Sequence, residues 1–276
     1  MTKKNKVYQL ALFGNPVSHS LSPQIHQLFA KQFDIQINYQ LIKVTNEEFP
    51  RAVMDFFNSS GTGANVTLPL KEEALTIPNN ISSIADKAQA INTFFLTDKN
   101  VISGDNTDGI GFINDLSHRC HFDCKDRRIL ILGAGGATKG IVPEIMLQKP
   151  KELIIANRSI EKAKNISQRN NAQALTLIEL EHLETKFDLV VHASSLGHQG
   201  ESLKFRKQQI HASSICYDLS YGQIAQPFLH LARSLGIKHN YDGIGMLIEQ
   251  AAVSFQRWFN KKPNTTGIIK RLKLKP

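Results

Sequence analysis

Short apolar runs alternate with segments of helical spacing along the whole chain. Apolar residues dominate positions 8–13 and alternate with polar ones at 39–44, and residues 63–67 form a third short stretch; together they predict three strands. Between the last two, residues 46–58 have the spacing of a helix with one apolar face. A polar loop over residues 14–23 leads from the first strand into another helix. The order strand, helix, strand is typical of a βαβ unit with parallel strands.

The alternation continues in shorter steps and then starts again after a charged linker at residues 123–128. In the first half we expect short helices at 70–75 and 83–90, paired strand ends at 93–96 and 101–103, and a helix at 109–116. In the second half we expect strands at 129–132, 153–156, 175–178, 189–193, 215–219 and 239–241, and helices ending near 147, 169, 235 and 259. This rhythm predicts an α/β fold in which parallel sheets carry helices on both faces.

The composition is that of an ordinary globular chain, with 276 residues of which 41% are hydrophobic and 21% charged. The apolar runs are too short to span a bilayer, and the basic N-terminus lacks the pattern of a signal peptide. Three cysteines, Cys120, Cys124 and Cys216, cannot all pair and do not form a plausible zinc set. We therefore expect a cytoplasmic protein without a metal site or a membrane partner.

The formal net charge of +9 permits either nucleic-acid binding or attraction of small anions. Basic residues are scattered, and no basic stripe interleaved with aromatic residues accompanies them. We therefore expect a small-molecule substrate and no nucleic acid. The sequence does not decide between a monomer and a homodimer.

A glycine-rich loop follows the apolar strand at residues 129–132 and opens a helix. It consists of Gly133, Ala134, Gly135, Gly136 and Ala137. Glycines let the backbone approach a pyrophosphate, and the free N–H groups at a helix start favour negative charge. Thr138 stands where the dinucleotide motif usually has its third glycine, so a purely structural tight turn is the alternative.

The end of the next strand selects the cofactor. A carboxylate there would bind the ribose hydroxyls of NAD, whereas a positive charge accommodates the 2′-phosphate of NADP. The chain has Asn157, Arg158 and Ser159 at this point, and Lys162 follows in the first turn of the next helix. These residues predict NADP. The alternative is that Ser159 only caps the helix and Arg158 only faces solvent.

Polar side chains also gather at predicted strand ends in the first half of the chain. The segment 104–109 holds two carboxylates, an amide and a hydroxyl between glycines; we expect Asp108 to serve a site and Asp105 to brace the turn. Further hydroxyl, amide and ammonium groups come from Ser20, Ser22, Thr67, Lys71 and Asn92. Because the carboxyl ends of parallel strands converge on a crevice, we expect a site for a small polyhydroxylated carboxylic acid.

Taken together, these motifs resemble the shikimate dehydrogenase family over nearly the whole chain. The matching segments are 14–23, 65–71, 90–93, 104–109, 133–137, 157–159, 218–221 and 243–250. Several motifs in the right order are far more specific than any one of them. The resemblance implies NADP-linked, reversible reduction of 3-dehydroshikimate to shikimate, on the route to aromatic amino acids.

The resemblance also implies roles for single residues. Ser20 and Ser22 would hold the substrate carboxylate, and Lys71 and Asp108 would form the catalytic pair. The ring hydroxyls would be held by Thr67, Asn92 and Gln250, while Tyr221 would line the edge of the substrate site and Leu219 and Gly243 would contact the nicotinamide. The chemistry agrees, since reduction of a ketone leaves an alkoxide to which the Lys71 ammonium can give a proton.

Three departures from the family pattern stand out. The segment 192–194 reads His-Ala-Ser instead of Asn-Ala-Thr, Gln89 replaces a glycine, and Gln226 replaces a threonine. The first departure bears on how the ribose and nicotinamide side of the cofactor is held. None of the three removes a proposed catalytic group.

The motifs divide the chain into two expected domains. Residues 1–109 plus 245–276 would form an α/β substrate-binding and catalytic domain, and residues 110–244 a Rossmann-like, doubly wound NADP-binding domain. Two alternatives remain open: a quinate/shikimate dehydrogenase of broader scope that also uses NAD, and a non-catalytic, ligand-sensing regulator.

Overall fold

The fold is that of a computed structural model, which describes residues 6–194 and 205–272. The chain divides into two compact units. Unit 1 comprises Met1–Gly111 and Leu247–Pro276, and unit 2 comprises Phe112–Met246. The boundaries fall inside two helices, α4 (Asp108–His118) and α9 (Ile244–Phe259).

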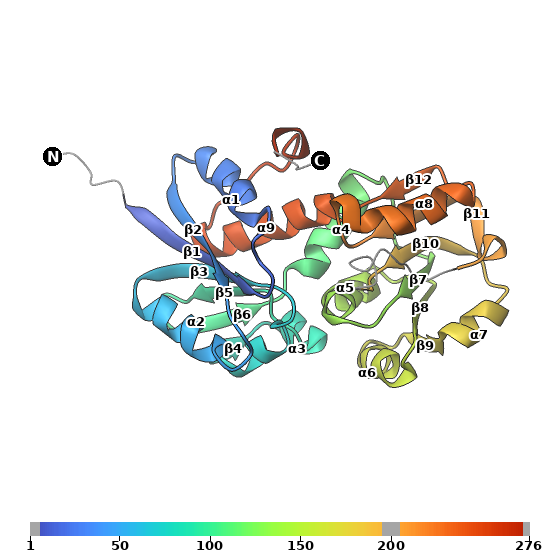
Figure 1. The fold of residues 1–276 in the computed structure, drawn as a ribbon, viewed down its shortest axis with the longest axis horizontal. Helices are drawn as coiled ribbons and strands as arrows, with labels where there is room; N and C mark the ends of the chain where they lie inside the picture. The colour runs from blue at the N-terminus through green and yellow to red at the C-terminus, as the bar shows by residue number, and fades with distance from the viewer. Residues whose placement is uncertain (1–5, 195–204, 273–276) are drawn as a thin grey trace. The chain divides into compact units, whose positions relative to one another are not determined.

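Unit 1 contains a six-stranded sheet of order β2-β1-β3-β5-β6-β4 (Figure 1). The strands are β1 (Val7–Gly14), β2 (Gln36–Lys43), β3 (Gly61–Val66), β4 (Asn80–Ile81), β5 (Thr93–Leu96) and β6 (Ile102–Asp105). The helices are α1 (Ser22–Lys31), α2 (Phe49–Asn58) and α3 (Ser83–Ala88), together with the 3₁₀ turns η1 (Glu73–Thr76) and η5 (Ile269–Arg271). In Figure 1, α2 and α3 lie on one side of this sheet and α1 and α9 on the other.

The sheet of unit 1 is mixed, with both parallel and antiparallel strand pairs. Strands β1, β2 and β3 pair in parallel, but β5 runs antiparallel to both β3 and β6. The connection between β5 and β6 is short, which permits a hairpin between these two strands and leaves no room for a crossover helix. The helix expected at residues 70–75 is only the 3₁₀ turn η1.

Unit 2 contains a fully parallel sheet of order β12-β11-β10-β7-β8-β9. Its strands are β7 (Arg128–Leu132), β8 (Glu152–Asn157), β9 (Gln173–Thr176), β10 (Phe187–His192), β11 (Ile210–Asp218) and β12 (His239–Tyr241). Its helices are α5 (Gly136–Leu147), α6 (Ile160–Asn170), α7 (Leu177–His182) and α8 (Gln226–Ser234), with the 3₁₀ turns η3 (Lys207–Gln209) and η4 (Gly222–Ala225).

Alternate residues of the central strands in unit 2 enter two separate cores. Ile129 and Ile131 of β7 join one core, which α5 and α6 cover, while Leu130 and Leu132 join the other, which α7 and α8 cover. Burial on both faces explains why residues 129–132 of β7 are continuously apolar and not alternating. The expectation of a doubly wound α/β sheet is thus confirmed for this unit.

One expected strand in unit 2 is partly a helix. The strand expected at 175–178 ends at Thr176, which is the N-cap of α7, and the helix begins at Leu177. The Thr176 hydroxyl accepts the Glu179 N–H at 3.1 Å, and the Glu179 carboxylate accepts the Thr176 N–H at 2.7 Å. This capping box is visible in the sequence as Thr-x-x-Glu and favours a helix start over a strand.

Two further observations concern the described residues of both units. Over residues 6–194 and 205–272, no helix combines the length and the apolar character needed to cross a bilayer. Cys120, Cys124 and Cys216 are unpaired and buried, and burial raises the pKa of each thiol to about 12.

A buried histidine lies at the centre of the aromatic packing of unit 1. His26 of α1 is fully buried, stacks on Tyr39 at 4.9 Å and lies 4.9 Å from the ring of Trp258. In the described residues neither of its ring nitrogens has a hydrogen-bond partner. Burial lowers the pKa of His26 to about 3, so the ring is neutral at physiological pH.

This burial makes the stability of unit 1 sensitive to acid. Below the ordinary pKa of 6.5 the unfolded chain takes up a proton that the folded unit rejects, so the free energy of unfolding falls as the pH drops from 6.5 toward about 3. The expected slope is roughly 1.4 kcal/mol per pH unit. His26→Leu should remove this contribution. The single tryptophan, Trp258, lies in unit 1, so urea unfolding followed by its fluorescence reports on this unit.

His19→Leu, at an exposed loop histidine of the same unit, is the matched control and should keep the wild-type slope. Equal slopes for the wild type and His26→Leu would contradict a neutral, buried His26.

Candidate active site

Lys71 and Asp108 form a close ion pair in unit 1. The Lys71 Nζ donates to the Asp108 Oδ2 at 2.5 Å, and the two side chains are only 18% and 6% exposed. Lys71 lies in the segment that follows β3. The backbone of this segment is held by a hydrogen bond of 2.8 Å from the Ile91 N–H to the Lys71 carbonyl. Asp108 is the first residue of α4. The pair expected from the sequence is therefore together in space.

The Asp108 carboxylate is held from several sides. Its Oδ1 accepts from the Asn92 Nδ2 at 2.8 Å, and its own N–H donates to the Asn106 Oδ1 at 3.1 Å. One carboxylate oxygen thus faces the lysine and the other faces an amide. This arrangement fixes the position of the Lys71 ammonium group.

Asn92 connects this pair to a buried polar network. Its Oδ1 accepts the Thr107 N–H at 2.9 Å, and its Nδ2 lies 2.9 Å from the Thr107 hydroxyl and 3.3 Å from the Gln250 Oε1. Gln250 comes from α9, distant in sequence but within the same unit. Of the expected substrate residues, Asn92, Gln250, Lys71 and Asp108 are therefore joined by hydrogen bonds.

The sequence reasoning missed one member of this network. The Ser254 hydroxyl lies 2.8 Å from the Thr93 hydroxyl and 3.2 Å from the Thr107 hydroxyl, and it accepts from the Asn65 Nδ2 at 3.1 Å. The available signal was its spacing, because Ser254 follows Gln250 by one helical turn and shares its face.

Asp105 stabilises the turn at residues 104–109, as expected from the sequence. It accepts from the Ser82 hydroxyl at 2.5 Å, from the Asn106 N–H at 2.8 Å and from the Arg257 Nη2 at 2.9 Å. These contacts tie the turn to α3 and α9. The two carboxylates of the segment therefore serve different partners.

The expected carboxylate-binding serines and Thr67 lie at neighbouring strand ends. The Ser20 hydroxyl donates to the Ser22 hydroxyl at 3.1 Å, at the start of α1. Pairing of β1 with β3 sets Phe13 opposite Val66, so the loops that carry the serines and Thr67 leave the sheet side by side. In the described part of the chain, no hydrogen bond joins these hydroxyls to Lys71 or Asp108.

The glycine loop in unit 2 combines one packed glycine with two open ones. Gly133 has φ of 115°, and a Cβ there would lie 2.9 Å from the Ala193 backbone. The Thr138 hydroxyl donates to the Gly133 carbonyl at 2.9 Å, which explains why a threonine can replace the third glycine of the motif. At Gly135 and Gly136 a Cβ would meet nothing within 4 Å.

This loop fits a dinucleotide. Gly135 is the N-cap of α5, which begins at Gly136, so the free N–H groups of the first turn and the open space lie together. Ala134 and Ala137 complete the loop with side chains no larger than a methyl group. A pyrophosphate could therefore approach the backbone closely.

The residues expected to select NADP lie at the end of β8. Asn157 is the last residue of β8, and its Nδ2 donates to the Ser159 carbonyl at 2.9 Å. Ser159 is the N-cap of α6, but its hydroxyl makes no capping hydrogen bond. Arg158 and Lys162 are exposed, and in the described residues no ion pair engages Arg158.

Three further expected residues follow the strands at one edge of the sheet in unit 2: Leu219 and Tyr221 come after β11, and Gly243 comes after β12. The Leu219 N–H donates to the His192 carbonyl at 2.9 Å, and the Gly243 N–H donates to the Ser220 carbonyl at 2.8 Å. A Cβ at Gly243 would lie 2.1 Å from the Leu219 carbonyl oxygen, so close packing alone requires glycine here. Tyr221 is half-buried beside them.

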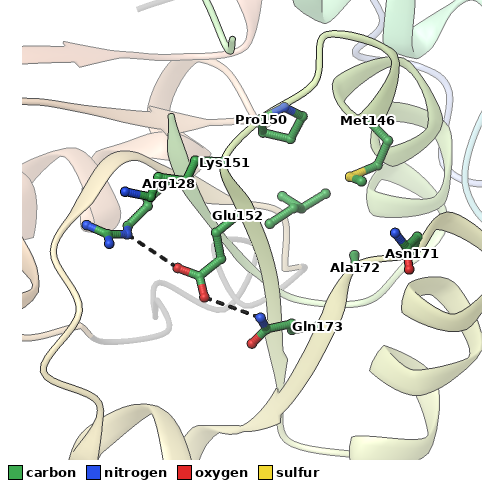
Figure 2. A pocket seen from close by; sticks show the side chains of 9 residues that line it. Arg128, Met146, Pro150, Lys151, Glu152, Asn171, Ala172 and Gln173 are labelled. Atoms are coloured by element: carbon green, nitrogen blue, oxygen red, sulfur yellow. Dashed lines mark hydrogen bonds and ion pairs between the residues drawn. The ribbon is translucent and has the colours of Figure 1, made fainter. Parts of the chain in front are cut away.

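A separate pocket lies at the other end of the same sheet. It has a volume of about 340 Å³ and is lined by residues at the starts of β7, β8 and β9 (Figure 2). Glu152 is held there by Arg128 at 3.6 Å and by Gln173 at 3.3 Å. None of the expected site residues lines this pocket. In the described residues, no cluster of three or more His, Cys, Asp or Glu could hold a metal ion.

Comparison with known proteins bears directly on this arrangement. Three family profiles match the chain: "Shikimate dehydrogenase substrate binding domain" over residues 12–94, "Shikimate / quinate 5-dehydrogenase" over 115–215 and "Shikimate 5'-dehydrogenase C-terminal domain" over 243–273. The shikimate dehydrogenase (NADP(+)) of Coxiella burnetii is 40% identical over 266 residues, which are 95% of this chain and 97% of that protein. The chain belongs to the shikimate dehydrogenase family.

Solved structures agree with this membership. The Ael1 enzyme from Pseudomonas putida superposes with a TM-score of 0.88 at 33% identity and covers 97% of this chain and 99% of its own. Shikimate 5-dehydrogenase from Thermus thermophilus, in complex with NADP(H) and shikimate, gives a TM-score of 0.82 at 26% identity and covers 95% and 97% of the two chains. As a member of this family the chain is an NADP-dependent oxidoreductase with the α/β fold expected from its sequence.

The glycine loop allows a prediction about stability. Gly133→Ala should destabilise unit 2 by about 1–3 kcal/mol, because the residue has a positive φ and its Cβ would meet backbone atoms. Gly136→Ala should keep the stability within about 0.5 kcal/mol of the wild type, because its Cβ enters open space. Chemical unfolding followed by circular dichroism measures both. An equal loss in the two variants would contradict the distinction between packed and open glycines.

Proposed function

We propose that the protein is an NADP-dependent shikimate dehydrogenase that reversibly reduces 3-dehydroshikimate to shikimate, in the pathway to chorismate and the aromatic amino acids. The observation that carries the proposal is the hydrogen bond of 2.5 Å between Lys71 and Asp108, joined to buried amide and hydroxyl groups in a chain of this family. A relative that is 40% identical to this chain is named shikimate dehydrogenase (NADP(+)).

Lys71 is the proposed proton donor. NADPH supplies the hydride to the ketone when it is bound. The ketone oxygen then gains negative charge, which a protonated Lys71 relieves by giving it a proton from Nζ. In the reverse direction the neutral amine accepts that proton. Asp108 orients Nζ, and Asn92 in turn holds the Asp108 carboxylate.

Further residues are proposed to bind the substrate. Ser20 and Ser22 would bind the carboxylate, and the ring hydroxyls would be bound by Thr67, Asn92 and Gln250, with Tyr221 at the edge of the site. The hydrogen bonds of Asn92 and Gln250 within the Asp108 network support two of these assignments. Hydroxyl and amide groups suit a substrate rich in hydroxyls because each can both donate and accept.

The cofactor roles belong to unit 2. The loop Gly133 to Ala137 would hold the pyrophosphate, and Leu219 and Gly243 would line the nicotinamide. The 2′-phosphate would be bound by Asn157, Arg158, Ser159 and Lys162. On this proposal residues 1–109 plus 245–276 bind substrate and residues 110–244 bind NADP. A cytoplasmic location and a homodimer stay predictions; the molar mass in solution would test the second.

Removal of the proton donor tests the proposed chemistry. Lys71→Ala should lower kcat for shikimate oxidation by about 100- to 10,000-fold, because a general acid–base group contributes on this order. The KM for NADP should stay near the wild-type value. Steady-state oxidation of shikimate, followed by NADPH absorbance, measures both. Lys87→Ala, at an exposed lysine of α3, is the control and should leave kcat unchanged.

An unchanged kcat in Lys71→Ala would refute the mechanism. Oxidation of quinate by the wild type at a comparable kcat/KM would instead favour the broader quinate/shikimate dehydrogenase. Absence of any turnover with bound shikimate would favour a ligand-sensing regulator.

Removal of the arginine at β8 tests the cofactor preference. Arg158→Ala should raise the KM for NADP by about 10- to 100-fold, the loss expected for a charge-assisted hydrogen bond to phosphate, and should leave the KM for NAD nearly unchanged. The matched control is Arg169→Ala, at an exposed arginine near the end of α6. A wild type that prefers NAD, or an equal rise in both KM values, would contradict the reading of Arg158.

A further inference from the structure

Arg119 directly follows α4 and contacts two aspartates of unit 2. Its Nε donates to the Asp115 Oδ1 at 2.9 Å and its Nη2 to the Asp115 Oδ2 at 2.7 Å. The same Nη2 donates to the Asp242 carbonyl at 2.5 Å, and Nη1 lies 3.5 Å from the Asp242 Oδ1. The guanidinium group also lies over the rings of Tyr217 and Tyr241, at 5.8 and 5.3 Å. Because its donors form a rigid, planar fork, these contacts fix its orientation.

Asp115 holds Arg119 from the interior of unit 2. Its side chain is only 4% exposed, and its Oδ2 accepts from the Tyr217 hydroxyl at 2.6 Å. Tyr217 is fully buried, and its hydroxyl oxygen accepts the Met246 N–H at 3.3 Å. A Cβ at Gly245 would overlap the Asp115 carboxylate. Asp115 is therefore fixed in the core, and so is the guanidinium group that it binds.

Asp242, between β12 and α9, joins Arg119 to the loop after β11. Its Oδ2 accepts the Gly222 N–H at 3.3 Å, and its Oδ1 accepts the Ile244 N–H at 3.4 Å. Arg119 contacts both the carbonyl and the carboxylate of Asp242. The position of Arg119 therefore determines where this segment lies.

The segment that Asp242 belongs to also carries a residue proposed to line the nicotinamide. Gly243 follows Asp242 directly, and its N–H donates to the Ser220 carbonyl at 2.8 Å. A Cβ at Gly243 would overlap the Leu219 carbonyl oxygen, so the two backbones lie in close contact. A displacement of Asp242 would therefore move both Gly243 and Leu219.

We propose that Arg119 and Asp242 are positioning residues for hydride transfer, which hold Leu219 and Gly243 in the place where the nicotinamide ring of NADP binds. Neither of the two side chains is proposed to touch the cofactor. A small displacement is sufficient, since a misplacement of about 1 Å can cost on the order of 100-fold in rate. This inference rests on the proposed function and extends it to residues outside the expected site.

Single-turnover kinetics test the inference. Enzyme in excess over NADP is mixed rapidly with saturating shikimate, and the absorbance of NADPH is followed. Arg119→Met keeps an apolar stem over the tyrosine rings and removes every donor. Its rate constant should fall by about 10- to 100-fold. The rate constant reports only folded, loaded enzyme, so a role confined to stability would leave it unchanged.

Asp242→Ala is the second variant. It removes the acceptor of the Gly222 and Ile244 N–H groups at a side chain that is 24% exposed, so it decides the test if Arg119→Met does not fold. Its rate constant should fall as well. The double variant should lose no more than the larger single loss, because both residues act on one segment. A wild-type rate constant in either folded variant overturns the proposal.

Calorimetry without substrate provides a readout that does not depend on turnover. NADP carries the nicotinamide, whereas 2′,5′-ADP carries only the adenine half of the cofactor. Both variants should bind NADP about three- to tenfold more weakly, because the displaced segment loses part of its contact with the nicotinamide, and should bind 2′,5′-ADP as the wild type does. An equal loss for the two ligands overturns the proposal, since a general disturbance of unit 2 has that effect.

The matched control is Arg127→Met in the same unit. Arg127 pairs with Asp188 at 3.4 Å and lies over the ring of Phe122 at 6.0 Å, near the starts of β7 and β10. It thus has the same kinds of contact as Arg119, away from Gly243 and Leu219. Arg127→Met should change neither the rate constant nor the two affinities.

The proposed function and this inference fail in different ways. A wild type that binds NADP but does not oxidise shikimate removes the proposed reaction, and the two affinities alone then decide whether Arg119 and Asp242 hold the nicotinamide site. Normal turnover of the wild type with unchanged rate constants in the variants removes the inference and leaves the proposed function.

Discussion

A carboxylate buried in a protein must find partners for its lone pairs, and Asp108 illustrates how much structure that requirement involves. One oxygen faces the Lys71 ammonium and the other an amide hydrogen of Asn92. Asn92 is itself held by hydrogen bonds from the Thr107 backbone N–H and to the Gln250 side chain. Three segments that are remote in sequence must therefore be in place before this one charge is stable, and the same condition sets the geometry that a proton transfer needs.

The sequence determined the secondary structure well wherever periodicity was strong. The apolar strand before Gly133 and the helix after it were predictable because burial on both faces demands continuous apolar residues. The antiparallel β5 was not, since strand direction depends on the pairing partner and not on local composition. The capping box at Thr176 was visible in the sequence, but its helix is short and follows a strand directly.

The candidate site shows a similar division. Lys71, Asp108 and Asn92 could be selected because polar groups at strand ends converge, and the family resemblance gave them roles. Ser254 could not be selected in this way, because a serine on a mostly apolar helix gains meaning only from the residues opposite it. The hydrogen bonds of His192 were also unpredictable: the departure from the family pattern was evident, but its partner Asp218 lies on another strand.

Unit 1 is assembled from two stretches of sequence, and this has a consequence for how the chain folds during synthesis. Gln250 and Ser254 emerge from the ribosome only after all of unit 2 has been made. At about 5–20 residues per second, the first stretch waits on the order of ten seconds for them. During that time the buried polar network around Asn92 and Asp108 lacks the hydrogen-bond partners that α9 supplies. Unit 2, in contrast, is one continuous segment and can complete its core first.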